Sequence, residues 1–415
     1  MPSASHAQGY SAGQQSEKLK FPTHDRMSPE IELLLCCLRT PTLPQAEGRV
    51  AELLQASLNW DVLLALAQWH RVTPLFYWHL KQGGGWEKLG DEVRSHLSGR
   101  FQQNLQNNFL LTTILLKVMR QFQAQDVRAI PFKGVVLAGQ VYGNLGLRQV
   151  SDIDILVEKS EVAIAQKLLQ DAGFFPAQVL TPPQQVLRLK SNYEDVWLHP
   201  ESETPLDLHW NLLPPFFPCQ ISVAELISRS QPYVLGKNRL PSLDPVDLLL
   251  VLCVNGSKDG WLELQRLCDV FYCLKKYPQL DGEELLQRAA SYDCLRMVLL
   301  GLSLTQLLFQ HPLPVGIKEA IEGDRMIPTL TQTIYQRFLT PTPPQLSLLE
   351  RAYFPLQLQP GWQKKLAYCA KLVLPINERD LESIHLPQFL FPLYYPLRLL
   401  RLIAKHTRDL KRHFF

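Results

Sequence analysis

The chain has 415 residues, of which 46% are apolar and 20% are charged, and its formal net charge is +3. These values describe a globular protein of two or three domains and exclude nucleic-acid binding by the bulk charge of the whole chain. The eight cysteines contain no CxxC pair, which argues against a zinc site. We therefore expect reduced thiols in the core of a cytoplasmic protein.

The first 125 residues are expected to form a tail and a helical region. Residues 1–26 are rich in Ser, Gln and Gly and lack an apolar run, so they predict a flexible tail and not a signal peptide. Ser28-Pro29-Glu30 is typical of a helix start, and helical patterns continue to Gln125. Residues 27–125 are thus expected to hold four or five helices, in which His70 and His79 are packing or surface residues.

Residues 131–157 bring a Lys-Gly turn, an arginine and two alternating aspartates into one short stretch. The run Val127–Phe132 predicts a strand, and the helix expected after Lys133-Gly134 would offer free N–H groups to an anion. In Asp152-Ile153-Asp154-Ile155 the alternation predicts a strand with both carboxylates on one face. Oxygen ligands at this spacing suit a hard ion such as Mg²⁺, which is usually shared with substrate phosphates.

A third carboxylate follows in Pro205–Trp210, where Asp207 and His209 share one strand face and two leucines share the other. The stretch Tyr193–Leu198 predicts the partner strand of a hairpin. If Asp207 is not the third acid of the site, Glu194 or Asp195 on this strand is the next carboxylate to test. The expected fold class is α+β, with a small mixed β-sheet over residues 126–218 flanked by N-terminal and C-terminal helical regions.

The order of these motifs resembles the nucleotidyltransferase superfamily of the DNA polymerase beta type. It is most similar to a poorly characterised bacterial branch with K-G, R-x-x-x-D-x-D and D-L-H-W motifs, and Trp69–Leu75 resembles a recurrent stretch of that branch. The wider superfamily has Gly-Ser or Gly-Gly where this chain has Lys133-Gly134. The resemblance implies that three acids are catalytic metal ligands: Asp152, Asp154 and Asp207. It implies that a second set binds the nucleotide phosphates: Lys133, Gly134, Arg148 and Ser151.

Residues 219–338 are expected to be mainly helical and to pack on the sheet. Within them, Asn255–Trp261 predicts a turn that opens the helix Leu262–Leu274. Lys258 in this turn could reach a triphosphate or an acceptor, and His209 could support a metal ligand or face the acceptor. The alternative for Lys258 is a solvated lysine beside a structural Arg266–Asp269 pair.

Residues 339–415 begin with a Pro-rich linker and end in a basic segment. Six basic residues stand along a leucine face: Arg398, Arg401, Lys405, Arg408, Lys411 and Arg412. Such a helix could make a weak contact with an anionic membrane or a polynucleotide, or it could dock on the core with its basic face in water. Prolines and arginines in the preceding apolar run argue against an integral membrane span.

The expected function is a Mg²⁺- or Mn²⁺-dependent nucleotidyltransferase. The hydroxyl of an unknown acceptor (a small molecule, an RNA end or a protein side chain) would attack a nucleoside triphosphate, with ATP among the candidates, and release pyrophosphate. Asp152 and Asp154 would bridge two ions, and Asp207 would hold the ion that activates the hydroxyl. Two alternatives stay open: a catalytically inactive binding or regulatory protein of the same fold, and a scaffold that recruits nucleic acid or membrane through its basic C-terminus.

Overall fold

The structure is a computed structural model that describes residues 27–39, 44–217, 219–313, 315–340 and 346–373. The expected N-terminal tail, most of the Pro-rich stretch and the basic C-terminal segment lie outside the described residues. None of the described helices is long and apolar enough to cross a bilayer. All eight cysteines are free thiols; seven are buried, and Cys369 is exposed.

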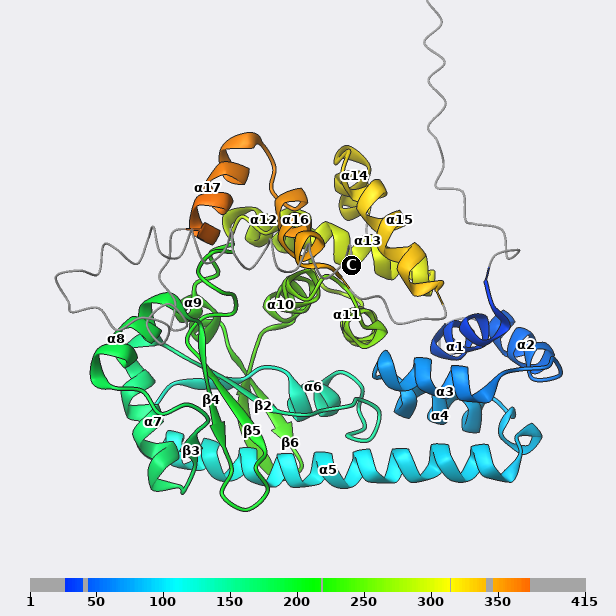
Figure 1. Ribbon diagram of the computed structural model, residues 1–415, viewed down its shortest axis with the longest axis horizontal. Helices are drawn as coiled ribbons and strands as arrows, with labels where there is room; N and C mark the ends of the chain where they lie inside the picture. Colours follow the sequence, from blue (N-terminus) through cyan, green and yellow to red (C-terminus); the bar gives the residue numbers. More distant parts are fainter. Residues whose placement is uncertain (1–26, 40–43, 218, 314, 341–345, 374–415) are drawn as a thin grey trace, which may run out of the picture.

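In the part of the chain that the structure describes, five α-helices and a short 3₁₀ helix precede the first strand. They are α1 (Pro29–Arg39), α2 (Pro44–Leu53), α3 (Trp60–Trp69), α4 (Thr73–Gln82), η2 (Trp86–Lys88) and α5 (Asp91–Ala124). At its start α1 is capped by Ser28, whose Oγ accepts a hydrogen bond from the amide of Ile31 (3.4 Å). The 34-residue helix α5 runs along the molecule, under α3 and α4 at one end and under the sheet at the other (Figure 1).

The main sheet has five strands: β1 (Ala129–Pro131), β2 (Ile153–Val157), β3 (Phe175–Pro176), β4 (Glu194–Leu198) and β5 (Pro205–His209). Their order is β1-β2-β5-β4-β3. Only the β2–β5 pair is parallel, and its register places Asp154 opposite Asp207. The expected mixed sheet, and with it the α+β fold class, is confirmed. One detail was wrong: β2 begins at Ile153, so Asp152 precedes the strand.

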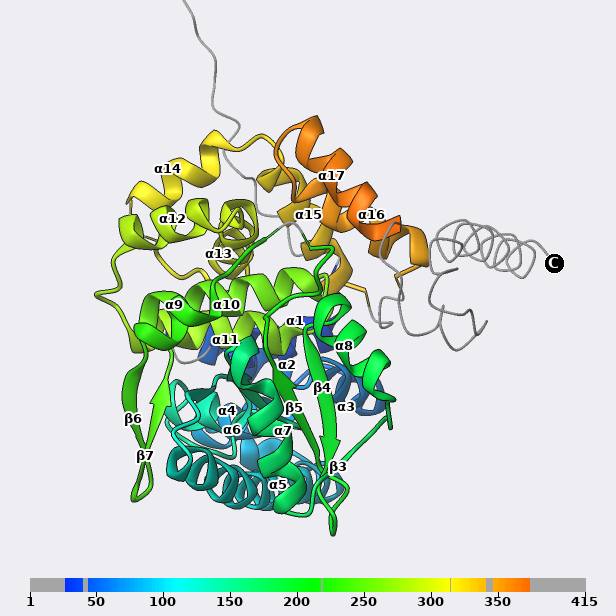
Figure 2. The same cartoon turned by 90° about the vertical axis from the view of Figure 1, so that its left-hand side faces the viewer.

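Short elements connect the strands of the sheet and lead away from it. They are α6 (Gly134–Gln140), η3 (Lys159–Glu161), α7 (Val162–Asp171), α8 (Pro182–Ser191), α9 (Val223–Ser228), β6 (Gln231–Leu235) and β7 (Asn238–Ser242). The strands β6 and β7 pair with each other as an antiparallel hairpin, which Figure 2 shows at one side of the molecule. The sequence pattern did not reveal this hairpin or α8.

Eight helices follow among the described residues: α10 (Pro245–Lys258), α11 (Leu264–Lys276), α12 (Gly282–Ser291), α13 (Leu295–Phe309), α14 (Val315–Gly323), α15 (Ile327–Phe338), α16 (Leu348–Gln357) and α17 (Trp362–Val373). The turn expected over Asn255–Trp261 was misplaced, because Asn255 to Lys258 form the last turn of α10. The chain reverses after it, where Gly260 and Trp261 both have positive φ (69° and 54°). Trp261 is fully buried against Gly256, where even a Cβ atom would collide with its ring.

Two apolar cores hold these layers together. The larger core joins α1–α4 to α10–α15, and it contains Phe76 from the first group and Phe271 from the second. The smaller core lies between the sheet, α5 and α7. His70 and His79 belong to the helix packing, as expected, although they lie at two different helices; burial lowers the pKa of each to about 4. Because the larger core joins α1–α4 to α10–α15, the N-terminal and C-terminal helices contact each other as well as the sheet.

Candidate active site

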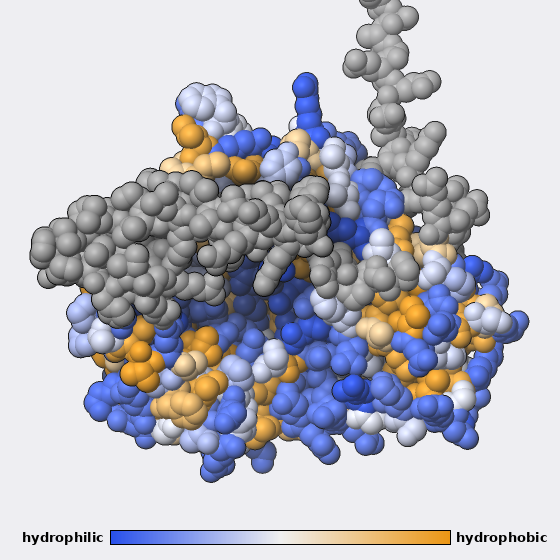
Figure 3. Space-filling model, viewed as in Figure 1, coloured by the Kyte–Doolittle hydropathy of each residue, from blue (hydrophilic) through white to orange (hydrophobic). Residues whose placement is uncertain are grey.

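A cavity of about 160 Å³ opens where the sheet, the α3–α4 turn and the α10–α11 turn meet. All 14 residues that line it have polar side chains. They are Arg71, Lys133, Arg148, Ser151, Asp152, Asp154, Glu194, Asp207, His209, Asn255, Lys258, Asp259, Gln265 and Arg266. The molecular face in Figure 3 is hollowed and hydrophilic near its centre, with apolar residues toward its sides. Such a lining suits a charged ligand better than an apolar one.

Asp154 and Asp207 form the acidic centre of this cavity. The Oδ1 atom of Asp154 accepts hydrogen bonds from Lys133 Nζ (3.3 Å) and His209 Nε2 (3.0 Å). Burial by itself would raise the pKa of Asp154, but the charge of Lys133 and these two hydrogen bonds hold it well below its ordinary value. Burial and the charges of Asp154, Glu194 and Asp152 raise the pKa of Asp207 to about 7. The two neighbouring carboxyl groups thus titrate far apart.

The same group of side chains fits a divalent cation. Carboxylate oxygens of Asp154 and Asp207 and a ring nitrogen of His209 all lie within 4.8 Å of one another. Burial and the charges of Asp154, Glu194 and Asp152 raise the pKa of Asp207, and a bound cation would relieve the repulsion between these carboxylates. Carboxylate ligands suit Mg²⁺ or Mn²⁺. Asp152 lines the cavity but is not part of this three-residue group.

His209 stands between two carboxylates. Its Nε2 contacts Asp154, and its Nδ1 lies 3.1 Å from Glu194 Oε2. Its ring also meets the ring of Phe132 edge to face, with the centroids 5.2 Å apart. This arrangement fixes the orientation of the imidazole and, through it, that of Asp154. Asp195, in contrast, pairs with Arg188 (2.7 Å) away from the cavity lining.

The four residues expected to bind phosphate all lie at or beside the cavity, but three of them already have partners. Lys133 is bonded to Asp154, and Ser151 Oγ accepts a hydrogen bond from Arg71 Nη2 (3.2 Å). Arg148 is buried, and its Nε and Nη2 donate to Asp269 at 2.9 and 3.0 Å. Their contacts with a nucleotide stay predictions.

Gly134, the fourth, has a φ of +54°, and a Cβ atom there would lie 3.3 Å from the carbonyl oxygen of Asp152. Only glycine adopts this conformation without strain, so the Lys-Gly turn can pass directly beside the acidic stretch.

The ion pair that the sequence suggested between Arg266 and Asp269 was wrong. Asp269 accepts from Arg148 and from the hydroxyl of Tyr142 (2.6 Å), whereas Arg266 Nη2 lies 3.0 Å from Asp259. The solvated alternative for Lys258 is also wrong, because its side chain is only 18% exposed and lies in the cavity. Burial and the charge of Lys133 lower the pKa of Lys258.

Sequence reasoning assigned five cavity residues from the helical regions no part in the site: Arg71, Asn255, Asp259, Gln265 and Arg266. Arg71 lies in the stretch Trp69–Leu75, whose resemblance to a family pattern was the available signal. Arg266 carried no comparable signal, because an arginine three residues before an aspartate on a helix is typical of a surface pair.

A small mixed sheet with acids on neighbouring parallel strands, opening on a polar and partly basic cavity, defines this protein as a nucleotidyltransferase. A family model described as "Uncharacterised nucleotidyltransferase" matches residues 56–310, and the chain belongs to this family. The matched region includes α3, α4, the sheet and α10 to α13, and so contains every residue that lines the cavity. A search of curated proteins found no match. Family membership makes the protein a transferase in general terms.

Proposed function

We propose that the protein is a Mg²⁺- or Mn²⁺-dependent enzyme that transfers a nucleoside monophosphate from a nucleoside triphosphate to a hydroxyl group of an acceptor. One observation carries the proposal. Asp154 and Asp207 lie side by side in register and open into an entirely polar cavity, where burial and the neighbouring carboxylate charges raise the pKa of Asp207 to about 7. Carboxylates crowded in this way suit metal-assisted phosphoryl chemistry.

Asp154 and Asp207 would hold the metal, with Asp152 beside them and His209 as a further ligand or as the group that orients Asp154. When bound, the metal neutralises charge on the phosphate oxygens and lowers the pKa of the attacking hydroxyl. The chain's own part is to hold the triphosphate and to aim the α-phosphorus at the acids. Lys133, Gly134, Arg148 and Ser151 remain the proposed phosphate contacts on the sheet side.

The reaction balances without a further reactant. The bond from the acceptor oxygen to the α-phosphorus forms, and the bond from the α-phosphorus to the bridging oxygen breaks. Pyrophosphate leaves with the electron pair of the broken bond, and the hydroxyl proton passes to water. A small molecule, an RNA end or a protein side chain could each supply the hydroxyl.

Calorimetric titration tests this function. ATP, GTP, CTP and UTP are titrated into the protein with Mg²⁺ and again with a chelator. We expect at least one triphosphate to bind, with an affinity at least about tenfold higher with the metal, since a tenfold change needs only about 1.4 kcal/mol.

Asp154→Asn should abolish the difference between the two titrations. Asp171→Asn, which removes an exposed carboxylate on α7, should leave it unchanged. Equal affinity of the wild-type protein with and without metal would contradict the metal-dependent mechanism.

A further inference from the structure

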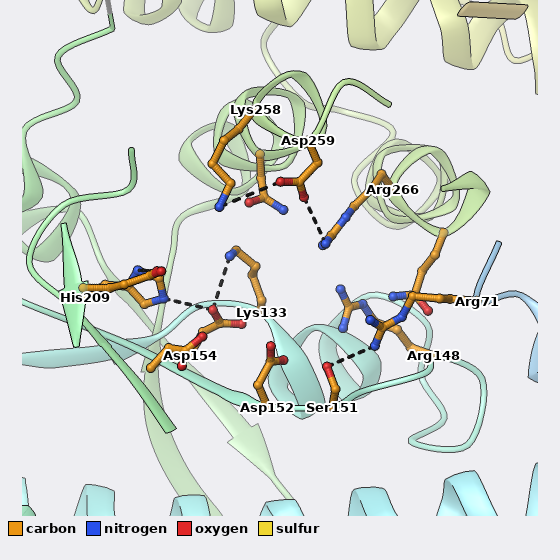
Figure 4. A pocket seen from close by; sticks show the side chains of 14 residues that line it. Arg71, Lys133, Arg148, Ser151, Asp152, Asp154, His209, Lys258, Asp259 and Arg266 are labelled. Atoms are coloured by element: carbon orange, nitrogen blue, oxygen red, sulfur yellow. Dashed lines mark hydrogen bonds and ion pairs between the residues drawn. The ribbon is translucent and has the colours of Figure 1, made fainter. Parts of the chain in front are cut away.

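The cavity is electrically divided. Four of its five acids, Asp152, Asp154, Glu194 and Asp207, lie on the side of the sheet, where Lys133 pairs with Asp154. Arg71 and Arg266 come from the helical regions, where the fifth acid, Asp259, pairs with Arg266 (3.0 Å). Figure 4 shows Arg71, Arg148 and Arg266 gathered at one side, across the cavity from Asp154 and His209. A ligand that carries divalent cations at one end and phosphate oxygens at the other matches this division.

Among the arginines of the cavity, Arg71 and Arg266 each have a buried nitrogen that donates no hydrogen bond. Arg71 Nη2 bonds to Ser151 Oγ (3.2 Å) and to the carbonyl of Gln149 (3.5 Å), but its Nε is buried without a hydrogen-bond partner. Arg266 pairs with Asp259 through Nη2 (3.0 Å), but its Nε is buried without a hydrogen-bond partner, although Glu263 lies 3.7 Å away. Buried donors left unpaired cost free energy, and phosphate oxygens would satisfy them.

Mutual repulsion of the arginines points the same way. Burial lowers the pKa of Arg71, and the charges of Arg148 and Arg266 lower it further. Arg148 has Asp269 as its counter-ion, but the opposing charges near Arg71, those of Glu263 and Asp152, make no hydrogen bond with it among the described residues. Arg266 has Asp259 as its counter-ion, so an anion between the two arginines would mainly offset the repulsion that acts on Arg71.

The two arginines are also held in fixed positions. Arg71 lies between α3 and α4 with a φ of +58°. Gln265, at the start of α11, donates its amide hydrogen to the carbonyl of His70 (3.1 Å), and its Oε1 accepts from the amide of Gln149 (3.1 Å). Gln265 thus ties the turn that carries Arg71 to the loop before Ser151, and Arg266 is its neighbour in sequence. Pre-placed donors lose little entropy when a ligand binds.

We propose that Arg71 and Arg266 bind the two terminal phosphates of the nucleoside triphosphate and receive the departing pyrophosphate, an inference that rests on the proposed function. The α-phosphorus then lies at the acids. Because attacking and leaving oxygens stand in line on opposite sides of that phosphorus, the acceptor hydroxyl arrives from the side of Glu194 and His209. The N-terminal and C-terminal helical regions thereby each supply one half of the pyrophosphate site.

The test compares the affinity for a triphosphate with the affinity for the matching monophosphate, both by calorimetry with Mg²⁺. Arg71→Asn is the first variant, because asparagine tolerates a positive φ better than alanine. Arg266→Ala is the second, and it carries no unusual backbone conformation. Arg100→Ala is the matched control: this arginine bonds to Gln68 (3.1 Å) outside the cavity.

We expect each cavity variant to lose about 10- to 100-fold in triphosphate affinity, the usual range for a charge-assisted hydrogen bond. Affinity for the monophosphate should change less than about twofold, and inorganic pyrophosphate with Mg²⁺ should bind the wild-type protein and the control but not the variants. Arg71→Lys should recover only part of the loss, because lysine restores charge without the planar fork.

Unchanged triphosphate affinity in both variants, or an equal loss for triphosphate and monophosphate, overturns this inference and leaves the proposed function standing. A wild-type protein that binds no triphosphate with metal overturns both. Circular dichroism melting verifies that each variant is folded, and if Arg71→Asn does not fold, the result for Arg266→Ala decides.

Discussion

At the scale of single residues, the properties of the site depend on which of the neighbouring charged side chains have hydrogen-bond partners. Asp154 has Lys133 and His209 as hydrogen-bond donors, whereas Asp207, its neighbour in register, receives no comparable hydrogen bond among the described residues. Burial of Asp207 and the charges of Asp154, Glu194 and Asp152 therefore raise its pKa to about 7, although the charge of Lys133 partly opposes them. Arg148 illustrates the same principle, because its counter-ion is Asp269 and not a carboxylate of the sheet.

Asp207 gives the metal-free protein a specific dependence on pH. Its pKa is about 7 in the folded state against an ordinary value of 3.8, so between these two pH values the folded state binds more protons than the unfolded one. The free energy of unfolding therefore falls as the pH rises through this window. Asparagine cannot ionise. We expect Asp207→Asn to leave the melting temperature nearly unchanged at pH 4 and to raise it by a few degrees at pH 8.

Melting curves recorded with a chelator measure this effect, and Asp171→Asn on the exposed face of α7 serves as the control. Adding Mg²⁺ and a triphosphate should stabilise the variant less than the wild-type protein. A variant that melts lower than the wild-type protein at pH 8 would show that Asp207 is a structural residue and not a crowded metal ligand.

At the scale of elements, the helix α5 positions the loop that leads into the acidic strand. Three asparagines on one side of this helix donate to backbone carbonyls of residues 145–150. Asn108 is buried and bonds to the carbonyls of Leu145 (2.6 Å) and Arg148 (2.9 Å). A buried loop needs such partners, because its carbonyls cannot reach water. The loop with Arg148 and Ser151 is thus shaped by α5 as well as by its own sequence.

Replacing Asn108 should therefore disturb both stability and the site. Asn108→Ala leaves the Leu145 carbonyl without this donor, and we expect the free energy of unfolding to fall by about 1–3 kcal/mol. Affinity for a triphosphate with Mg²⁺ should fall as well, because the loop before Ser151 loosens. Urea unfolding and calorimetry measure the two effects. Thr113→Ala, at an exposed position of the same helix, is the control, and equal stability of the two variants would contradict the proposed role of α5.

At the scale of the whole molecule, the cavity is an assembly of three regions. The sheet supplies the acids, the α3–α4 turn supplies Arg71, and α10 and α11 supply Lys258 and Arg266. The apolar core shared by α1–α4 and α10–α15 keeps the two helical regions together. Division of the chain at residues 126 and 218 stays a prediction, and the site requires residues from both sides of those boundaries.

This assembly predicts where a nucleotide protects the backbone. With Mg²⁺, a triphosphate should slow amide hydrogen exchange at residues 70–73 and at residues 259–265, although almost 200 residues separate the two segments in the sequence. The matching monophosphate should slow amide exchange in the sheet strands, whereas exchange in both turns should stay close to the rate measured with the metal alone. Exchange measured by mass spectrometry distinguishes the two cases. Protection confined to β2 and β5 with the triphosphate would place the terminal phosphates elsewhere.

The sequence by itself determined the local features of this protein. Alternating residues around Asp154 and Asp207 predicted two strands with acids on one face, because the side-chain period of a strand is fixed by covalent geometry. Helical patterns predicted helical regions on both sides of the sheet, and the order of motifs indicated the family that the family model confirms. These signals are local, so they do not depend on how distant segments meet.

Only the tertiary structure decided which charges neutralise one another and which remain available. Arg148 meets Asp269 across 121 residues, and Arg71 reaches Ser151 across 80. Ion pairs of this kind depend on burial and on the direction of whole helices, and the spacing of residues in the sequence carries no information about either. The sequence therefore supplied the acids of the site, whereas folding placed Arg71 and Arg266 across the cavity from Asp154.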